Sequence, residues 1–280
     1  MEITVAVGQL DPTEDAARNW EVGFTLARRA AEAGAEVLVL PEQAMLVQHP
    51  GDPQRFADLA AAAWAWWPQA LRDAAGELSL GIVAGGFAPP GSGGDGRAPG
   101  SSAADAPGDA RPFNVLVAVD PAGELEYCQA KTKLYDAFDF RESGMVRPGA
   151  GDSRPVQLAG VRFGLVNCYE LRFPELARRL VGLGAEALCI SAAWVRGPAK
   201  EDHWVTLARA RAIENSAYVL AAGTRAEDTI GRSMVIDPGG VVIAGLADEP
   251  QGIAVAQLDT ARLRAVRERT RSAPEPPAVS

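Results

Sequence analysis

The sequence predicts an α/β fold on two observations. Short β-branched runs alternate with stretches of helical periodicity, and polar residues follow directly where several of these runs end. The chain has 280 residues, of which 48% are hydrophobic and 22% are charged, an ordinary globular composition. At roughly 150 residues per domain, this length allows one large domain or two small ones.

The N-terminal part alternates strands and helices as far as residue 87. Helices are indicated by apolar residues that recur on one face and by end residues that favour caps, whereas buried strands are indicated by runs of Val, Ile and Leu. The expected elements are a strand at Ile3–Val7, a helix with Thr13 as its N-cap and Gly34 at its end, a strand at Val37–Leu40, a helix at Pro53–Ala75 and a strand at Gly81–Phe87.

Residues 89–111 interrupt this alternation. The segment consists mostly of Gly, Ala, Pro, Ser and Asp, and it has too few apolar side chains to offset the entropy lost on ordering. Gly91, Gly93 and Gly96 have the spacing of a dinucleotide-binding turn, but the prolines that follow prevent a helix from starting there. We therefore expect a flexible surface insertion and no nucleotide site.

The alternation resumes after the insertion. A hairpin is expected around the turn Pro121-Ala122-Gly123. The remaining expected strands are Val161–Asn167, Ala187–Ser191, Tyr218–Ala222, Met234–Ile236 and Ile253–Gln257, and the expected helices are Pro174–Leu183, His203–Ser216 and Thr260–Arg267. The proline-rich tail, residues 271–280, is expected to be disordered.

The charge balance excludes several partners. With 36 Asp and Glu against 27 Lys and Arg, the formal net charge is -9, which argues against binding to nucleic acids or anionic membranes. No apolar run approaches the roughly 18 residues of a membrane span. The first residues, Met1-Glu2-Ile3-Thr4, lack the basic residues of a signal peptide, so we expect a soluble cytoplasmic protein.

Cysteine and histidine are scarce in this chain. Cys128, Cys168 and Cys189 are an odd set without a Cys-x-x-Cys pair, which argues against a disulfide framework or a zinc site. His49 and His203 are too few for a multi-histidine metal site, and no Gly-x-Ser-x-Gly motif is present. If the protein is a hydrolase, its base is therefore expected not to be histidine.

Three polar residues follow strands in positions where α/β sheets bind ligands. Glu42 follows Val37–Leu40, Lys131 follows the strand that ends at Gln129, and Cys168 follows Val161–Asn167. Each one alone has an ordinary structural explanation: a turn residue, a solvated lysine and a small buried side chain. Together they provide a thiol nucleophile, a carboxylate base and a cation for the oxyanion.

The chain resembles the nitrilase superfamily of carbon–nitrogen hydrolases, which have a Glu-Lys-Cys triad. Five motifs in the order of the family carry this resemblance over nearly the whole chain. They are Leu40-Pro41-Glu42, Lys131-Thr132-Lys133-Leu134-Tyr135-Asp136, Phe140-Arg141-Glu142 with Arg147-Pro148-Gly149, Asn167-Cys168-Tyr169-Glu170-Leu171-Arg172-Phe173-Pro174-Glu175, and His203-Trp204 with Ala208-Arg209-Ala210-Arg211-Ala212-Ile213-Glu214-Asn215.

The resemblance implies a four-layer α-β-β-α sandwich that needs no metal or organic cofactor. It also implies that Cys168 attacks an amide carbonyl, that Glu42 accepts and returns the proton, and that Lys131 with the Tyr169 backbone N–H stabilises the oxyanion. Glu142 is expected to bond to Lys131 or to the substrate amide. Lys131 and the N-terminus of the next helix are further expected to favour the Cys168 thiolate.

Three residues are candidate substrate contacts. Arg172 would bind a substrate carboxylate, or alternatively pair with Glu142 or Glu175. Trp194 follows a predicted strand and would wall the pocket, and His203 would cap or line it.

The nucleophile motif is similar to that of the omega-amidase and deaminated-glutathione amidase branch. It favours hydrolysis of a small linear amide through a thioester, with release of ammonia. An N-carbamoyl amino acid amidohydrolase, a nitrilase and a catalytically idle scaffold remain alternatives. The implied partners are the amide, water and further copies of the chain in a homodimer or larger oligomer.

The chain departs from the family pattern in three places. Lys133 stands where relatives commonly have His, the 89–111 insertion is unusually long, and Thr270–Ser280 lacks the usual arginine-rich closing segment. We expect a single domain over residues 1–270.

Overall fold

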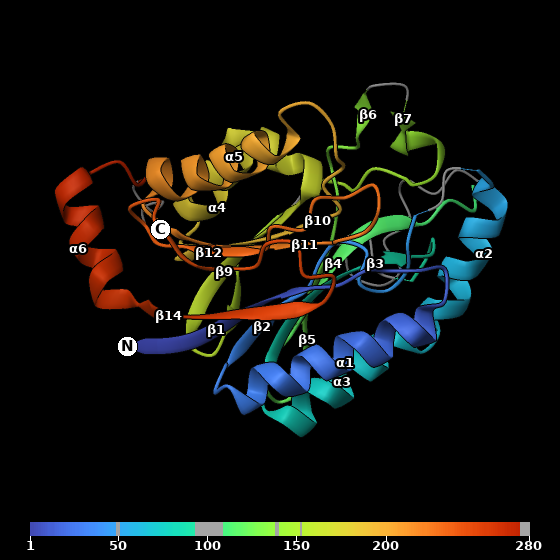
Figure 1. Cartoon of the computed structure of the whole chain (residues 1–280), viewed down its shortest axis with the longest axis horizontal. Helices are drawn as coiled ribbons and strands as arrows, with labels where there is room; N and C mark the ends of the chain where they lie inside the picture. Colours follow the sequence, from blue (N-terminus) through green and yellow to red (C-terminus); the bar gives the residue numbers. More distant parts are fainter. Residues whose placement is uncertain (49–50, 93–108, 138–139, 152, 275–280) are drawn as a thin grey trace.

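The computed structural model describes residues 1–48, 51–92, 109–137, 140–151 and 153–274. These residues form two six-stranded sheets that pack face to face, with helices on both outer faces (Figure 1). The first sheet has the order β14-β1-β2-β3-β4-β5, formed by Gly252–Asp259, Glu2–Gln9, Val37–Val39, Gly81–Ala88, Phe113–Val119 and Leu125–Ala130. The second has the order β13-β12-β11-β10-β9-β8, formed by Val242–Gly245, Met234–Ile236, Tyr218–Gly223, Ala187–Ala192, Val161–Asn167 and Val156–Leu158.

Three apolar layers separate the sheets and helices, so the predicted four-layer α-β-β-α sandwich is confirmed. Alternation along the strands assigns side chains to these layers. On β1, Val5 and Val7 face the core between the sheets, whereas Ala6 faces the helices. The outer core of the first sheet is covered by α1 (Ala16–Glu32), α2 (Pro53–Trp64) and α3 (Trp67–Leu78), and that of the second by α4 (Pro174–Gly182) and α5 (Lys200–Asn215).

Two predicted helices differ from the structure. The N-cap of α1 is Asp15, whose carboxylate accepts from the N–H groups of Ala17 and Arg18, because the Thr13 hydroxyl is already engaged by Asn19. The single helix expected at Pro53–Ala75 is two helices, α2 and α3. The break falls where Pro68, near the start of α3, would clash with the carbonyl four residues earlier in a continuous helix.

The remaining elements mostly match the sequence pattern. Helix α5 begins three residues before the expected start at His203, after Ala199 in the left-handed conformation. Helix α6 (Thr260–Thr270) lies at the end of the sandwich in Figure 1. Four short strands were not predicted: β8, β13 and the paired strands β6 (Asp136–Ala137) and β7 (Phe140–Arg141).

The insertion and the tail, which the sequence predicts to be flexible and disordered, lie largely outside the described residues. Residues 93–108 of the insertion and 275–280 of the tail are outside them, as is His49. The first residues of the tail are described, and there the Ser272 hydroxyl bonds to Ser216 and the Ser272 carbonyl accepts from Arg178. None of the helices in the described part of the chain combines the length and apolarity that crossing a bilayer requires.

The strand directions bring the ends of β2, β5 and β9 to one edge of the molecule. In each sheet three central strands are parallel, and β5 runs in the direction of β3 because two antiparallel pairings separate them. The sheets are joined at this edge by the Ser191 hydroxyl, which donates to the Leu40 carbonyl at 2.7 Å. The residues that follow β2, β5 and β9 therefore meet between the sheets.

Candidate active site

Glu42 lies in a tight turn after β2 that is held against β3. The Gly85 N–H donates to the Pro41 carbonyl at 3.0 Å, and the Met45 N–H donates to the Gly85 carbonyl at 3.1 Å. A Cβ atom on Gly85 would lie 2.0 Å from the Glu42 carbonyl oxygen. Only glycine fits there, and this close approach fixes the backbone that carries the Glu42 carboxylate.

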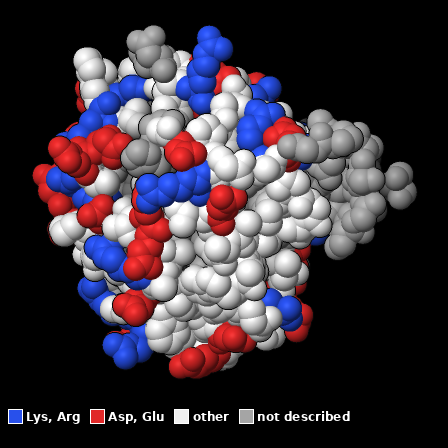
Figure 2. Space-filling model, turned by 90° about the vertical axis from the view of Figure 1, so that its right-hand side faces the viewer, with Lys and Arg blue, Asp and Glu red and all other residues white. Residues whose placement is uncertain are grey.

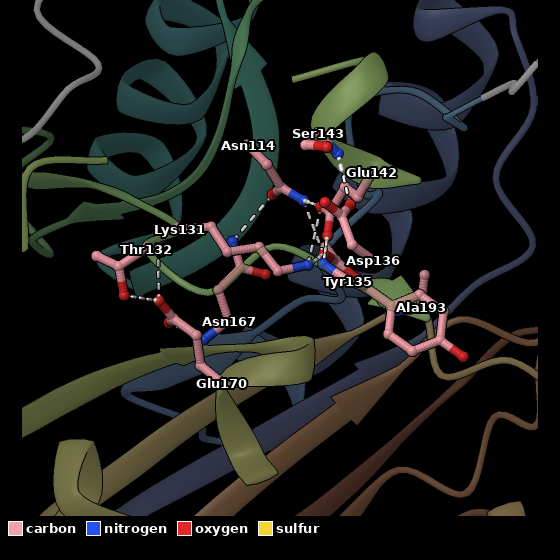
Figure 3. A network of polar contacts seen from close by, with 11 residues as sticks. Asn114, Lys131, Thr132, Tyr135, Asp136, Glu142, Ser143, Asn167, Glu170 and Ala193 are labelled. Atoms are coloured by element: carbon pink, nitrogen blue, oxygen red, sulfur yellow. Dashed lines mark hydrogen bonds and ion pairs between the residues drawn. The ribbon is translucent and has the colours of Figure 1, made fainter. Parts of the chain in front are cut away.

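Lys131 leaves the end of β5 with its backbone held on both sides. Its N–H donates to the Asn114 carbonyl, and its carbonyl accepts from the Gly149 N–H, both at 2.8 Å. The side chain is 2% exposed, and Nζ donates to Glu42 Oε1 at 2.8 Å and to Glu142 Oε1 at 2.9 Å. One ammonium therefore bridges two buried carboxylates, and the bond expected between Glu142 and Lys131 is present (Figure 3).

Cys168 is the first residue of the 3-10 helix η2 (Cys168–Arg172) that follows β9. Its φ of +46° lies in the left-handed region, which costs a non-glycine residue of order 1–3 kcal/mol and often marks a functional site. Cys168 is 9% exposed. Tyr169 follows it in the first helical turn, where N–H groups have no partner within the helix.

Two buried residues that the sequence did not single out tie these loops together. The Glu170 carboxylate accepts from the Thr132 N–H and hydroxyl at 2.7 and 2.8 Å, and from the Asn167 N–H at 2.9 Å, so it joins the residues next to Lys131 and Cys168. The Asn114 amide contacts Glu42, Glu142 and Asn167. The sequence signal for Asn114 is a polar side chain beside apolar neighbours, and that for Glu170 is its capping-box spacing of three residues after Asn167.

The charges of the cluster set the protonation state at rest. Although burial acts to raise it, the charge of Lys131 and bonds from Lys131, Ala193 and Cys168 lower the pKa of Glu42. Although burial acts to lower it, Glu142 and Glu42 raise the pKa of Lys131 well above its usual range. Burial and the Glu42 charge raise the pKa of the Cys168 thiol well above its usual range.

Lys131 favours the Cys168 thiolate, as expected, but the net shift of the thiol pKa runs the other way. Two carboxylates face one ammonium, so the attraction of Lys131 does not balance burial and the repulsion of Glu42. These shifts favour the ionised carboxylate of Glu42 and the protonated thiol of Cys168.

The three candidate substrate contacts lie together beside the cluster. The Arg172 guanidinium lies over the Trp194 ring at 4.9 Å, and its Nη2 is 3.4 Å from His203 Nδ1. His203 is exposed, whereas Trp194 is 4% exposed and donates Nε1–H to the Lys200 carbonyl at 2.8 Å. Among the described residues no ion pair joins Arg172 to Glu142 or Glu175, the two alternatives that the sequence left open.

An aromatic group next to Cys168 was also missed by sequence reasoning. The Tyr169 ring packs edge-on against Tyr135 at 5.0 Å and against Phe173 at 5.3 Å. Lys133 Nζ lies 5.4 Å from the Phe173 ring, and Lys200 Nζ bonds to the Tyr135 hydroxyl at 3.1 Å. Tyr135 comes from the lysine motif and the other two rings from the cysteine motif, so the three meet only in the folded chain.

The face of the molecule in Figure 2 does not carry a continuous basic surface. On the face shown in Figure 2, acidic and basic side chains are intermixed and border a broad area that carries neither. Within the described ranges, no three His, Cys, Asp or Glu side chains are grouped as metal ligands would be.

The fold and the buried carboxylate–lysine cluster place the protein in the class of nitrilase-like α-β-β-α sandwiches. The chain belongs to the carbon-nitrogen hydrolase family, whose sequence profile matches residues 4–268. The protein is accordingly a hydrolase that acts on non-peptide carbon–nitrogen bonds.

Named relatives agree with this family. The chain is 34% identical to a hydrolase of Mycobacterium tuberculosis over 281 residues, covering 95% of this chain and 92% of that protein. It is 33% identical to the deaminated glutathione amidase of Bos taurus over 275 residues, 94% of this chain and 78% of that protein. The match to the deaminated glutathione amidase of Escherichia coli O157:H7 is 45% identical but covers only 56% of this chain and 59% of that enzyme.

Solved structures show the same fold. The NitFhit protein of C. elegans superposes with a TM-score of 0.82 at 27% identity, over 96% of this chain and 64% of that one. The nitrilase-superfamily amidase of Nesterenkonia AN1 superposes with a TM-score of 0.75 at 23% identity, over 96% and 95% of the two chains.

Proposed function

We propose that this protein hydrolyses a small linear amide through a thioester on Cys168 and releases ammonia. The observation that carries the proposal is the buried Lys131 ammonium that bridges Glu42 and Glu142 beside Cys168. This arrangement provides a base, a nucleophile and an oxyanion donor without histidine.

The reaction starts from the protonated thiol. Cys168 Sγ attacks the amide carbon while its proton passes to Glu42, and the Lys131 ammonium with the Tyr169 N–H stabilises the oxyanion. One such donor is worth about 3 kcal/mol of transition-state free energy. Glu42 returns the proton to the amide nitrogen, ammonia leaves, and the acyl group remains on sulfur as a thioester.

Water completes the cycle. Glu42 removes a proton from a water molecule, which attacks the thioester carbon, and Cys168 leaves with that proton. The products are a carboxylic acid and the resting thiol. Glu142 does not exchange protons in this scheme but holds Lys131 and the substrate amide in position.

The substrate is proposed to contact Arg172, Trp194 and His203, which lie together beside the cluster. The guanidinium suits a carboxylate on the substrate, and relatives named deaminated glutathione amidase support an amide of this kind. We further propose that the enzyme acts as a homodimer or larger oligomer in a reducing cytoplasm, where a reactive thiol persists.

The test is single replacement of each triad residue, with Cys168→Ala, Glu42→Gln and Lys131→Met. Each variant is expected to lose amide turnover by at least ~100-fold, measured as ammonia release from ω-amides, carbamoyl amino acids and nitriles. Cys189→Ala is the matched control, because it removes a buried thiol on β10 that is absent from the polar cluster.

Three results would contradict the proposal. Retained turnover in Cys168→Ala would show that Cys168 is not the nucleophile. Release of carbon dioxide together with ammonia would identify a carbamoylase. No ammonia from any substrate, with no labelling of Cys168 by a thiol probe at neutral pH, identifies an idle scaffold.

A further inference from the structure

Asn114 is a fully buried polar residue in the otherwise apolar strand β4. Its side-chain Nδ2 lies 2.8 Å from Glu42 Oε1 and 3.0 Å from Glu142 Oε1, and its Oδ1 lies 2.9 Å from Asn167 Nδ2 (Figure 3). One amide thus touches both carboxylates that bind Lys131 and the residue before Cys168.

The surroundings fix the orientation of this amide. With Nδ2 toward the carboxylates, its two hydrogens go to two acceptors and Oδ1 accepts from a donor. The flipped amide would place oxygen against two carboxylate oxygens and nitrogen against the Asn167 nitrogen, so no bond would form.

The hydrogen bonds of Glu42 are unevenly divided between its two oxygens. Oε1 accepts from Lys131 Nζ and from Asn114 Nδ2, both at 2.8 Å, which occupies both of its lone pairs. Oε2 accepts one backbone N–H, from Ala193 at 2.8 Å, and retains one lone pair. Without Asn114 both oxygens would have an open position for a proton.

We propose that Asn114 is a positioning residue that occupies Oε1 of Glu42 together with Lys131 and thereby reserves Oε2 for the proton of Cys168. This inference rests on the proposed reaction. The thiol proton moves to Oε2, the electron pair left on sulfur forms the bond to the substrate carbon, and the same proton later leaves Oε2 for the amide nitrogen. With both lone pairs of Oε1 occupied and Oε2 held by Ala193, the carboxylate is kept from rotating and its one open position lies on Oε2.

The role requires an amide at this position. Two donors on one nitrogen and an acceptor on the same planar group match two carboxylates and Asn167, whereas an aspartate has no donor when ionised and adds a third negative charge. The charged and titratable groups that face Glu42 are Lys131 after β5, Glu142 in the short helix η1 (Glu142–Gly144) and Cys168 in η2, with Glu170 behind Lys131.

The test compares Asn114→Asp and Asn114→Ala with the wild-type protein between pH 4.5 and 8. Alkylation of Cys168 by iodoacetamide is followed by mass spectrometry of its peptide, and kcat/KM for ammonia release is measured in parallel. We expect a wild-type profile that is nearly flat, since the pKa of Glu42 is lowered. Asn114→Asp is expected to slow both rates by about 10- to 100-fold and to move the acid limb upward by about one pH unit. The acid limb of Asn114→Ala is expected to move in the same direction by a smaller amount.

The matched control is Asn19, a buried asparagine of α1 that donates to the carbonyls of Thr13 and Met45. Asn19→Asp and Asn19→Ala lose comparable bonds, so they are expected to lower stability while leaving the pH profile in place. If Asn114→Asp does not fold, Asn114→Ala carries the same comparison.

Two outcomes overturn the inference: Asn114 variants with the wild-type pH profile, or Asn19 variants with the same shift. Alkylation needs no substrate, so the two proposals fail separately. If the alkylation profile of the Asn114 variants shifts but no amide yields ammonia, the role of Asn114 stands and the proposed reaction is refuted. If the wild-type protein releases ammonia normally but the pH profile of the Asn114 variants does not shift, the proposed reaction stands and the role of Asn114 is refuted.

Discussion

Replacing Gly85 by alanine tests whether the turn that carries Glu42 is held by backbone contact. The added Cβ would lie 2.0 Å from the Glu42 carbonyl oxygen and 2.3 Å from its Cα. Carbon atoms pack at about 3.5–4.0 Å, and neither partner is a side chain that could rotate away, so strand and turn must separate by more than about 1 Å. A displacement of about 1 Å in a catalytic group costs roughly 100-fold in rate.

We therefore expect Gly85→Ala to lower kcat/KM for ammonia release by about 100-fold or more. Overpacking also costs about 1–3 kcal/mol of the free energy of unfolding, which urea denaturation measures. Gly86→Ala is the control, because its Cβ would meet side-chain atoms, the Trp67 ring at 3.0 Å and Met45 Sδ at 3.3 Å. It is expected to lose stability but keep its activity. A folded Gly85→Ala protein with wild-type kcat/KM would refute the reasoning.

Two further predictions concern stability. Lys131→Met leaves the Glu42 and Glu142 carboxylates buried without their cation, so we expect urea denaturation at pH 7 to show a loss of about 3–5 kcal/mol; an unchanged midpoint would contradict it. Burial acts to raise the pKa of Asp237, but the hydrogen bond from Arg262 lowers it below its usual range. The Asp237 carboxylate therefore stabilises the fold at pH values above its unfolded pKa, and this stabilisation is lost as the pH falls through the lower pKa of the folded state. Asp237→Asn is then expected to lower the free energy of unfolding by about 1–2 kcal/mol at pH 7, the lower end of the usual range because Arg262 is half exposed. The variant is also expected to lose less stability on acidification than the wild-type protein. Parallel acid denaturation curves for the two proteins would contradict this prediction.

The sequence was informative where a residue's role depends on its immediate neighbours. Glu42, Lys131 and Cys168 each follow a recognisable strand, and parallel strands bring their ends to one edge, so their meeting followed from local patterns. The break between α2 and α3 was missed, although its cause is local: Pro68 lies inside the predicted helix.

Other features depend on contacts between segments far apart in the chain. Asn114 lies within an apolar strand, and its partners Glu42 and Asn167 are 72 and 53 residues away, so only the register of two sheets reveals its role. The net shift of the Cys168 pKa could not be predicted for the same reason. The direction of this shift depends on burial and on the carboxylates around Lys131 in three dimensions, which the order of the motifs does not show.

The pairing of β1 with β14 joins Glu2 to Asp259, nearly the whole length of the chain apart. Among the described residues, β14 is the strand that pairs with that edge of β1, so the edge can be covered in this way only once β14 has been made. The sheet that bears Glu42 and Lys131 is complete only after residue 259 has left the ribosome. The proposed nucleophile and base are therefore synthesised well before the strand that completes the sheet bearing Glu42.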